Sequence, residues 1–286
     1  MSVAVITDSA AALPDSLASV NGITVVPMWL TIADQAVREG ERTLGELIGD
    51  ERVTTSGPTP GEFEEAIRSR LAEPGVDDVL VCTIAASMSS TYEAAAVAAR
   101  EVGDRVSVID TTTAAGAEAL VVLEAARVAT EGRSLDVVEA AARRVIERVR
   151  LIATLPTLDH LVRGGRVPSI AGWAGRHLSI NPLFEFSGGG VKRLRPALSA
   201  EAAHDRIVAA CLRSRPDDAA ALHVVALHAL AREVAEHLLG GVEADVQPAT
   251  SFVEEFGSVM VVHTGPGLAG LAWWWESPAD QASSAI

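Results

Sequence analysis

The chain has 286 residues, of which 49% are hydrophobic, and a formal net charge of −15 at pH 7. This length and composition suffice for one large or two ordinary globular domains with buried cores. The excess of acidic residues repels phosphate backbones and anionic lipid surfaces, so the composition argues against nucleic-acid binding.

Neither the N-terminal region nor any apolar run has the character of a targeting or membrane segment. The first residues lack the basic region, apolar core and cleavage site of a signal peptide. No apolar run approaches the roughly 20 residues that a membrane span needs. We therefore expect a cytoplasmic protein without stable membrane insertion, in which Cys82 and Cys211 are buried free thiols.

In the first half of the chain, β-branched runs alternate with segments of helical periodicity. The runs that predict strands are residues 3–6, 79–83, 106–109 and 149–155. The segments that predict helices are residues 14–20, 60–71, 91–102, 114–130 and 135–148. Strands that alternate with helices indicate an α/β domain with a parallel sheet. Ligands bind such sheets at the carboxyl ends of the strands, where residues 7–9, 83–92 and 110–113 would lie.

The second half has a different texture, because glycine and proline cluster between residues 164 and 196. The following residues predict a helix at 201–213, a strand at 222–228, a helix at 231–239 and a terminal strand at 258–263. This pattern is typical of a smaller α+β domain. We place the boundary near Leu155, which gives domains at residues 1–155 and 156–280 and a fraying tail at 281–286.

Three polar segments, at residues 54–60, 87–92 and 263–267, offer hydroxyl groups and one imidazole without an acid. A carboxylate accepts hydrogen bonds and needs only donors around it, so these segments suit an anionic head group. Thr55, Ser56 and Thr59 also suit the capping of a helix at residue 60, and Ser89 the capping of a helix at residue 91. Capping and ligand binding are compatible, because a helix N-terminus has free amides.

Several catalytic and cofactor chemistries fit the sequence poorly. Residues 265–270 spell G-x-G-x-x-G, but too little chain follows to supply the helix, strand and acid of a dinucleotide site. Lys192 is the only lysine and lies outside any phosphate-loop motif, and the histidines lack the spacing of metal ligands. Ser89, His263 and Asp8 or Asp110 are the residue types of a serine hydrolase. No G-x-S-x-G elbow surrounds Ser89, so the hydrolase remains a rival hypothesis.

Five segments, taken in order, resemble the DegV family of bacterial fatty-acid-binding proteins. They are Val-Ile-Thr-Asp-Ser at residues 5–9, the polar segments at 54–60 and 87–92, Leu-Val-Arg-Gly-Gly-Arg at 161–166, and His-Thr-Gly-Pro-Gly at 263–267. The chain departs from the family pattern at Gly57, where glutamine is usual, at Ser90, where glycine is usual, and at His160, where tyrosine is common.

The resemblance implies a DegV-like fold in which an apolar tunnel between the two domains encloses a long-chain fatty acid. It implies that Thr55, Ser89 and His263 hold the carboxylate, within a site of Thr55, Ser56, Ser89, Ser90, His263, Thr264 and Gly265. A separate dihydroxyacetone-kinase-like protein would bring ATP and Mg²⁺ and form an acyl phosphate for phospholipid synthesis. The chain itself would be a binding protein without a cofactor or metal, not an enzyme. A lipid storage or sensing protein without a kinase is the other alternative.

Residues 163–195 form a basic island on an acidic chain. Its single acid is Glu185, and its cations are Arg163, Arg166, Arg176, Lys192, Arg193 and Arg195. Such a run is either a solvated face whose charges pair elsewhere or a docking and phosphoryl-transfer surface. The resemblance favours the second interpretation for Arg166, Arg193 and Arg195, which we expect to face the kinase.

Overall fold

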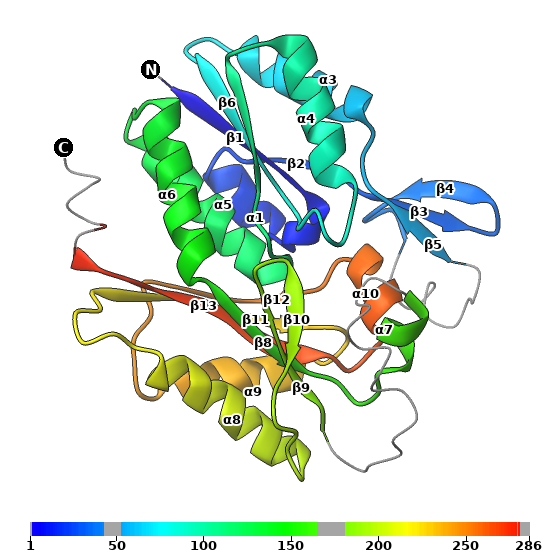
Figure 1. Cartoon of the computed structure of the whole chain (residues 1–286), viewed down its shortest axis with the longest axis vertical. Helices are drawn as coiled ribbons and strands as arrows, with labels where there is room; N and C mark the ends of the chain where they lie inside the picture. The colour runs from blue at the N-terminus through cyan, green and yellow to red at the C-terminus, as the bar shows by residue number, and fades with distance from the viewer. Residues whose placement is uncertain (1, 43–52, 165–180, 279, 281–286) are drawn as a thin grey trace. The chain divides into compact units, whose positions relative to one another are not determined.

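The computed structural model describes residues 2–42, 53–164, 181–278 and 280, and Figure 1 shows their elements. The chain divides into two compact units. Unit 1 comprises Met1–Glu147 with Gly257–Val259, and unit 2 comprises Arg148–Phe256 with Met260–Ile286. The domain boundary at Leu155 stays a prediction.

The core of unit 1 is the predicted parallel sheet, with strand order β2-β1-β6-β7. Its strands are β1 (Val3–Asp8), β2 (Thr24–Val26), β6 (Asp78–Thr83) and β7 (Val106–Asp110). All of its pairings are parallel. Every residue of β1 is buried, as expected for a strand covered on both faces. The strands expected at residues 3–6, 79–83 and 106–109 are therefore confirmed as one sheet.

Helices cover both faces of this sheet, with α3 and α4 on one face and α5 and α6 on the other (Figure 1). The helical segments of unit 1 are η1 (Ser9–Ala11), α1 (Asp15–Val20), α3 (Pro60–Leu71), α4 (Thr91–Val102), α5 (Ala115–Thr130) and α6 (Leu135–Arg148). Phe63 and Ile67 of α3 and Ala95 of α4 pack on the β1 and β6 side chains. Helix α5 is buried along most of its length, which explains its almost continuous apolar sequence.

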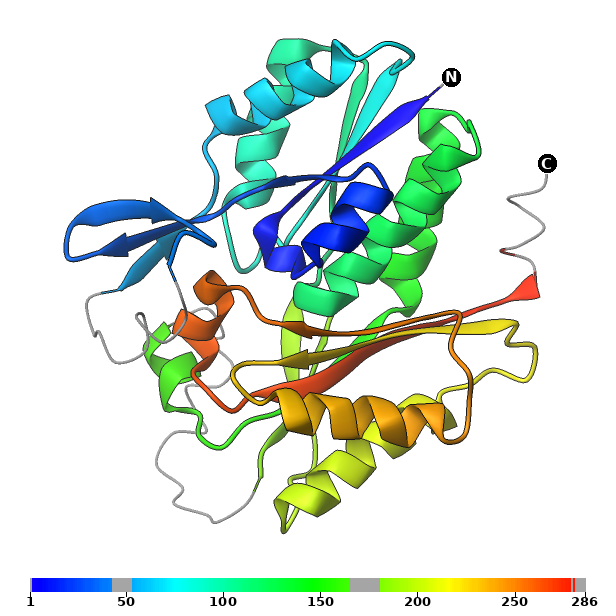
Figure 2. The same cartoon turned by 180° about the vertical axis from the view of Figure 1, so that it is seen from behind.

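A second, three-stranded antiparallel sheet in unit 1 has the order β4-β3-β5 and was not predicted from the sequence. Its strands are β3 (Trp29–Ile32), β4 (Gln35–Arg38) and β5 (Thr54–Ser56), visible in Figures 1 and 2. The Trp29 indole donates a hydrogen bond of 3.0 Å to Glu62 at the start of α3. This contact joins the small sheet to α3, and the pairing of β5 with β3 holds residues 54–56 in a strand.

Unit 2 contains a six-stranded sheet of order β10-β9-β8-β13-β11-β12. Its strands are β8 (Arg150–Thr154), β9 (Leu183–Ser187), β10 (Gly190–Arg193), β11 (Ala221–His228), β12 (Thr250–Glu255) and β13 (Ala269–Glu276). Only β11 and β12 pair in parallel. Helices α8 (Ala200–Arg213) and α9 (Arg232–Glu243) lie side by side against this sheet (Figure 2). Unit 2 also contains the short helix α7 (Asp159–Gly164) and the part of α10 (Ser258–Thr264) that begins at Met260.

Two sequence-based predictions about this region are wrong. Residues 258–263, predicted as a strand, begin helix α10, because a short apolar run does not distinguish a strand from a buried helix. Residues 149–155, predicted among the parallel strands, form β8, which pairs antiparallel with β9 and β13. A β-branched run indicates a strand but carries no information about its partners.

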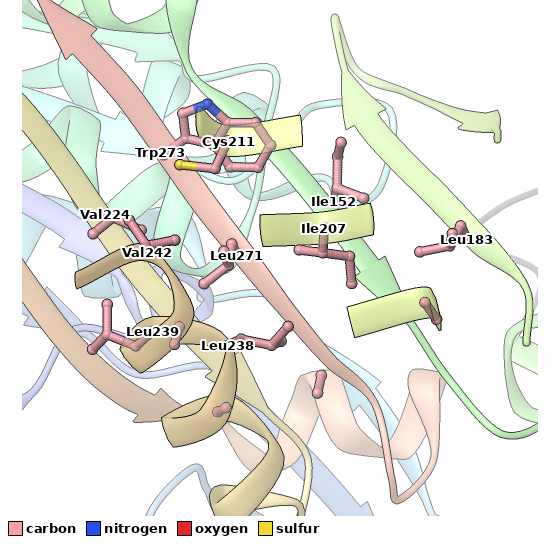
Figure 3. Packing of buried hydrophobic residues seen from close by; sticks show 14 of the residues in the cluster. Ile152, Leu183, Ile207, Cys211, Val224, Leu238, Leu239, Val242, Leu271 and Trp273 are labelled. Carbon is pink, nitrogen blue, oxygen red and sulfur yellow. The ribbon is translucent and has the colours of Figure 1, made fainter. Parts of the chain in front are cut away.

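The core of unit 2 lies between the sheet and α8 and α9. Figure 3 shows Ile152, Leu183 and Leu271 of the sheet meeting Ile207 of α8 and Leu238 of α9. Trp273 and the free thiol of Cys211 belong to the same cluster. Cys82 is likewise free and buried, so the expectation of two buried thiols is confirmed. In the described part of the chain, no helix combines the length and apolar character needed to cross a bilayer.

Candidate ligand-binding site

The loop between β6 and α4 carries the central residue of the predicted site, Ser89. Two acids at the carboxyl ends of neighbouring strands hold this loop. Asp8 accepts a hydrogen bond of 2.9 Å from the Ile84 amide, and Asp110 accepts one of 3.2 Å from the Ala86 amide. The expected gathering of residues 7–9, 83–92 and 110–113 at this edge of the sheet is thus confirmed. Their acids position the backbone of the loop that presents Ser89.

The Ser89 hydroxyl forms a local pair with Thr91, the first residue of α4. The two side-chain oxygens lie 2.7 Å apart, and the Thr91 amide donates to the Ser89 oxygen at 3.3 Å. Ser90, at the N-cap position, makes no side-chain capping bond and is exposed. Ser89 is half-buried, whereas Thr91 is fully buried. Ser89 therefore satisfies an amide of the first helical turn and keeps part of its surface accessible.

Residues 54–60 reach the same place from β5. A Cβ atom added to Gly57 would lie 2.5 Å from the Thr91 hydroxyl oxygen and 3.3 Å from that of Ser89. The structure therefore brings this segment against the Ser89 loop. Thr55 is half-buried in β5, opposite Leu30 of β3, and Ser56 is exposed.

Among residues 54–60, the capping interpretation holds for Thr59 only. Its hydroxyl accepts from the Glu62 amide at 3.3 Å, and the Glu62 carboxylate accepts from the Thr59 amide at 2.8 Å. This reciprocal pair is a capping box at the start of α3. Thr55 and Ser56 lie in a strand, so they do not cap the helix. Their hydroxyls are therefore not required by α3.

In unit 2, His263 and Thr264 form the last residues of α10. The Thr264 hydroxyl donates to the Met260 carbonyl at 3.1 Å, so it is held within its own helix. Gly265 follows with a φ of +76°, and a Cβ there would overlap the His160 ring. The backbone thus turns at a glycine in close contact with His160, one of the positions where the chain departs from the family pattern. That His263 joins Thr55 and Ser89 on one ligand stays a prediction.

The glycine-rich run after His263 serves this turn. Gly267 has a φ of +88°, and a Cβ there would lie 2.7 Å from the ring of Pro156. Residues 269–276 then form β13, where a dinucleotide fingerprint requires a helix. A strand at this position does not fit the dinucleotide pattern that residues 265–270 spell.

Two buried acids of unit 1 have strongly altered titration. Burial raises the pKa of Asp8 to about 7, although the amides of Ile84 and Ala10 lower it. Burial also raises the pKa of Glu118 on α5 well above its usual range, and the charge of Asp8 raises it further. The Thr7 hydroxyl donates to one Glu118 oxygen at 3.2 Å, while the other oxygen has no partner among the described residues. The sequence hint of this site is Glu118, an acid within the apolar run of α5.

A third acid, Glu39, binds a distant segment of the chain and was missed in the sequence. Its carboxylate accepts from the Val259 amide at 2.7 Å and from the Ser258 hydroxyl at 3.3 Å, and it also contacts the Ser9 hydroxyl. A Cβ on Gly257 would overlap this carboxylate. Burial raises the pKa of Glu39, which these hydrogen bonds partly offset. Residues 257–259 are thereby part of unit 1.

The geometry around Ser89 does not match that of a serine nucleophile. Within the described residues, the Ser89 side chain hydrogen-bonds only to Thr91. Asp8 and Asp110 accept backbone amides instead of orienting an imidazole. The described residues also contain no group of three or more histidine, cysteine or acidic side chains that could hold a metal ion. The arrangement suits hydrogen-bond donation to a ligand better than nucleophilic attack.

The basic island is only partly described. Arg166 and Arg176 lie outside the described residues, whereas Arg193 ends β10 and Arg195 follows it, both exposed. The single acid of the island, Glu185, forms a 2.7 Å ion pair with Arg150, which lies outside the island. Glu185 is thus engaged by an arginine from β8.

The chain is similar to DegV proteins over nearly its whole length. The DegV family model matches residues 2–276. A DegV domain-containing protein of Streptomyces coelicolor is 36% identical over 280 residues, covering 94% of this chain and 97% of the relative. A second such protein, from Mycobacterium tuberculosis, is 33% identical over 274 residues, covering 95% of this chain and 96% of the relative.

Solved structures agree with this match. A DegV family protein from Thermus thermophilus, described with its fatty acid binding, has a TM-score of 0.90 and 29% identity, covering 96% of this chain and 100% of that one. A DegV lipid-binding protein from Thermotoga maritima, at 24% identity, shares the fold with a TM-score of 0.84, covering 97% of this chain and 99% of that one. Because the family model and two relatives above 30% identity span nearly the whole sequence, the chain belongs to the DegV family.

Proposed function

We propose that this chain binds one long-chain fatty acid and holds its carboxylate with Thr55, Ser89 and His263. Ser56, Ser90, Thr264 and Gly265 complete the proposed head-group site. The observation that supports this proposal most directly is the Ser89–Thr91 hydroxyl pair, which lies beyond the carboxyl end of β6. Among the described residues, no acidic or basic side chain hydrogen-bonds to this pair. The fatty acid binding described for the Thermus thermophilus relative supports the same ligand class.

The energetics of such a ligand divide between its two ends. Each buried methylene contributes about 0.8 kcal/mol, so a sixteen-carbon chain supplies roughly 10 kcal/mol before ordering costs. A hydrogen bond to the charged carboxylate contributes about 1.5 to 3 kcal/mol. Affinity therefore comes mainly from the tail, and Thr55, Ser89 and His263 set the orientation of the head.

The bound acid is, in this proposal, presented to a separate dihydroxyacetone-kinase-like protein. That partner supplies ATP and Mg²⁺ and transfers a phosphoryl group to the carboxylate, which yields an acyl phosphate for phospholipid synthesis in the cytoplasm. Arg166, Arg193 and Arg195 form the docking or phosphoryl-transfer surface. Guanidinium groups suit this role because they bind carboxylates and phosphates in a bidentate manner. The chain contributes binding and orientation and no catalytic group of its own.

Native mass spectrometry of the purified chain tests the proposal directly. We expect one long-chain fatty acid per chain, and we expect Ser89→Ala and His263→Ala to weaken palmitate binding by about 10- to 100-fold, the effect of one charge-assisted hydrogen bond. Ser69→Ala, at an exposed position on α3, is the matched control and should bind palmitate like the wild type. A chain that purifies empty and binds no fatty acid at micromolar concentration would refute the proposal.

An assay of hydrolase activity distinguishes the fatty-acid-binding protein from the rival hypothesis, a serine hydrolase. The chain alone should not hydrolyse p-nitrophenyl esters or acyl thioesters, because the Ser89 hydroxyl bonds only to Thr91 among the described residues. Turnover that disappears in Ser89→Ala would favour the hydrolase instead. Fatty acid binding without acyl-phosphate formation by any kinase would favour a storage or sensing role.

A further inference from the structure

The hydrogen-bond inventory of the Ser89–Thr91 pair fixes the direction of donation between the two hydroxyls. Thr91 is 0% exposed, and its side-chain oxygen has the Ser89 oxygen as its only hydrogen-bond partner in the described part of the chain. A buried hydroxyl proton without an acceptor is unfavourable. The Thr91 proton is therefore assigned to the Ser89 oxygen.

This direction has a consequence for Ser89. A serine oxygen has two lone pairs and one proton. The Thr91 amide, at 3.3 Å, and the Thr91 hydroxyl, at 2.7 Å, together occupy both lone pairs. Only the Ser89 proton is left, and Ser89 is accessible enough to offer it outward. Ser89 is thus restricted to the role of donor.

We propose that Thr91 is a positioning residue that makes Ser89 an obligate hydrogen-bond donor to the ligand carboxylate. The inference rests on the proposed function and adds a residue to it. A ligand that offers only acceptors, such as a carboxylate, gains from this arrangement, whereas a ligand that must donate to Ser89 finds no free lone pair. Thr91 itself is buried and acts only through Ser89.

The position of the Thr91 hydroxyl also requires that residue 57 has no side chain. A Cβ on Gly57 would lie 2.5 Å from the Thr91 hydroxyl oxygen, closer than two such atoms can approach. Any larger residue must therefore displace the Thr91 hydroxyl or the strand end that carries Gly57. Gly57 differs from the glutamine usual in the family, so this chain uses a close approach that a longer side chain would prevent.

The test measures the binding of palmitate and of hexadecanol to the wild-type chain and to its variants. The variants are Thr91→Val, Thr91→Ser, Ser89→Ala and the double variant that combines Thr91→Val with Ser89→Ala. Loss of the Thr91 hydroxyl should weaken palmitate binding by about 3- to 10-fold, the range of one hydrogen bond. Thr91→Ser keeps the hydroxyl and should bind palmitate like the wild type. Hexadecanol has the same tail without the charge, and its binding should change little. In the Ser89→Ala background, Thr91→Val should have no further effect, because Thr91 acts through Ser89.

Gly57→Ala tests the requirement at residue 57, with Gly61→Ala as the matched control. A Cβ on Gly61 meets nothing closer than 4.0 Å. Gly57→Ala should reproduce the loss seen in Thr91→Val, and Gly61→Ala should not. Thermal unfolding of each variant identifies any that fail to fold. If Gly57→Ala fails to fold, the Thr91 variants still decide. If Thr91→Val fails to fold, Gly57→Ala decides, because its Cβ displaces the same hydroxyl.

The outcomes of the two tests are distinguishable. Suppose that the wild type binds palmitate. If Thr91→Val then weakens palmitate and hexadecanol binding equally, or if the losses add in the double variant, the positioning role is overturned and the proposed function stands. A wild-type chain that binds no fatty acid would overturn both.

Discussion

Replacement of the buried acid Glu118 tests how its raised pKa makes the stability of the chain depend on pH. Its carboxylate lies on α5, where it accepts one hydrogen bond from the Thr7 hydroxyl and has one oxygen without a partner among the described residues. Burial and the neighbouring charge of Asp8 raise its pKa well above 4.5. Glutamine has nearly the same shape and keeps an oxygen for Thr7. Glu118→Gln therefore removes the titration and preserves the described hydrogen bond.

The sign and size of the effect follow from proton linkage. A folded pKa above the unfolded value means that the folded chain binds more protons, so the free energy of unfolding falls as pH rises from 4.5 toward the folded pKa of Glu118. The slope for one group is about 1.4 kcal/mol per pH unit. Asp8, raised from 3.8 to about 7, adds a slope of the same sign in both proteins. The difference between variant and wild type therefore reports mainly Glu118.

Urea unfolding followed by circular dichroism at pH 5, 6, 7 and 8 measures this difference. We expect Glu118→Gln to be close to the wild type near pH 5 and increasingly more stable as pH rises. Glu124→Gln is the matched control, because Glu124 lies on the same helix and pairs with Arg127 at 2.8 Å. It should lower the free energy of unfolding, because it breaks the ion pair with Arg127. A difference between Glu118→Gln and wild type that stays flat across this pH range would refute the reasoning.

Two further predictions concern unit 2. Gly270→Ala should lower the free energy of unfolding by about 1 to 3 kcal/mol, measured in urea, because its Cβ would lie 2.5 Å from the Ile152 carbonyl oxygen. Gly240→Ala on α9, where a Cβ meets nothing within 4 Å, should not destabilise. Arg193→Ala and Arg195→Ala should leave palmitate binding intact and lower acyl-phosphate formation with the kinase. Parallel loss of binding and transfer would assign these arginines to the ligand site, and normal values for both would support the solvated face.

The sequence predicted those elements whose signal is local and strong. The strands β1, β6 and β7 were found because each is a short run rich in β-branched residues, and β1 and β6 are also almost fully buried. Helix α3 was found because Thr59, Pro60 and Glu62 carry the start signal of the helix themselves. In these cases the information lies within a few residues of the element, so no knowledge of the fold is required.

Other features depend on partners that are distant in the sequence. Strands β3 and β5 are three or four residues long and partly exposed, so their pattern is too weak without knowledge of their pairing. The last strand, β13, directly follows a glycine-rich turn that suggested a different motif. The approach of Gly57 to Thr91 depends on how β5 and the Ser89 loop meet in the folded unit. Residue types predicted the chemistry of the candidate site, but its geometry required the structure.

The contact between Glu39 and residues 258–259 has a consequence for how the protein folds as it is synthesised. The hydrogen bond to the Val259 amide joins groups 220 residues apart, and unit 1 includes Gly257–Val259. Closing such a loop in a flexible chain costs about 5 kcal/mol of entropy. The first 147 residues leave the ribosome long before Val259 does, so the Glu39 carboxylate lacks this partner until the residues up to Val259 have been translated. Completion of unit 1 is thus a late event, which follows the synthesis of most of unit 2.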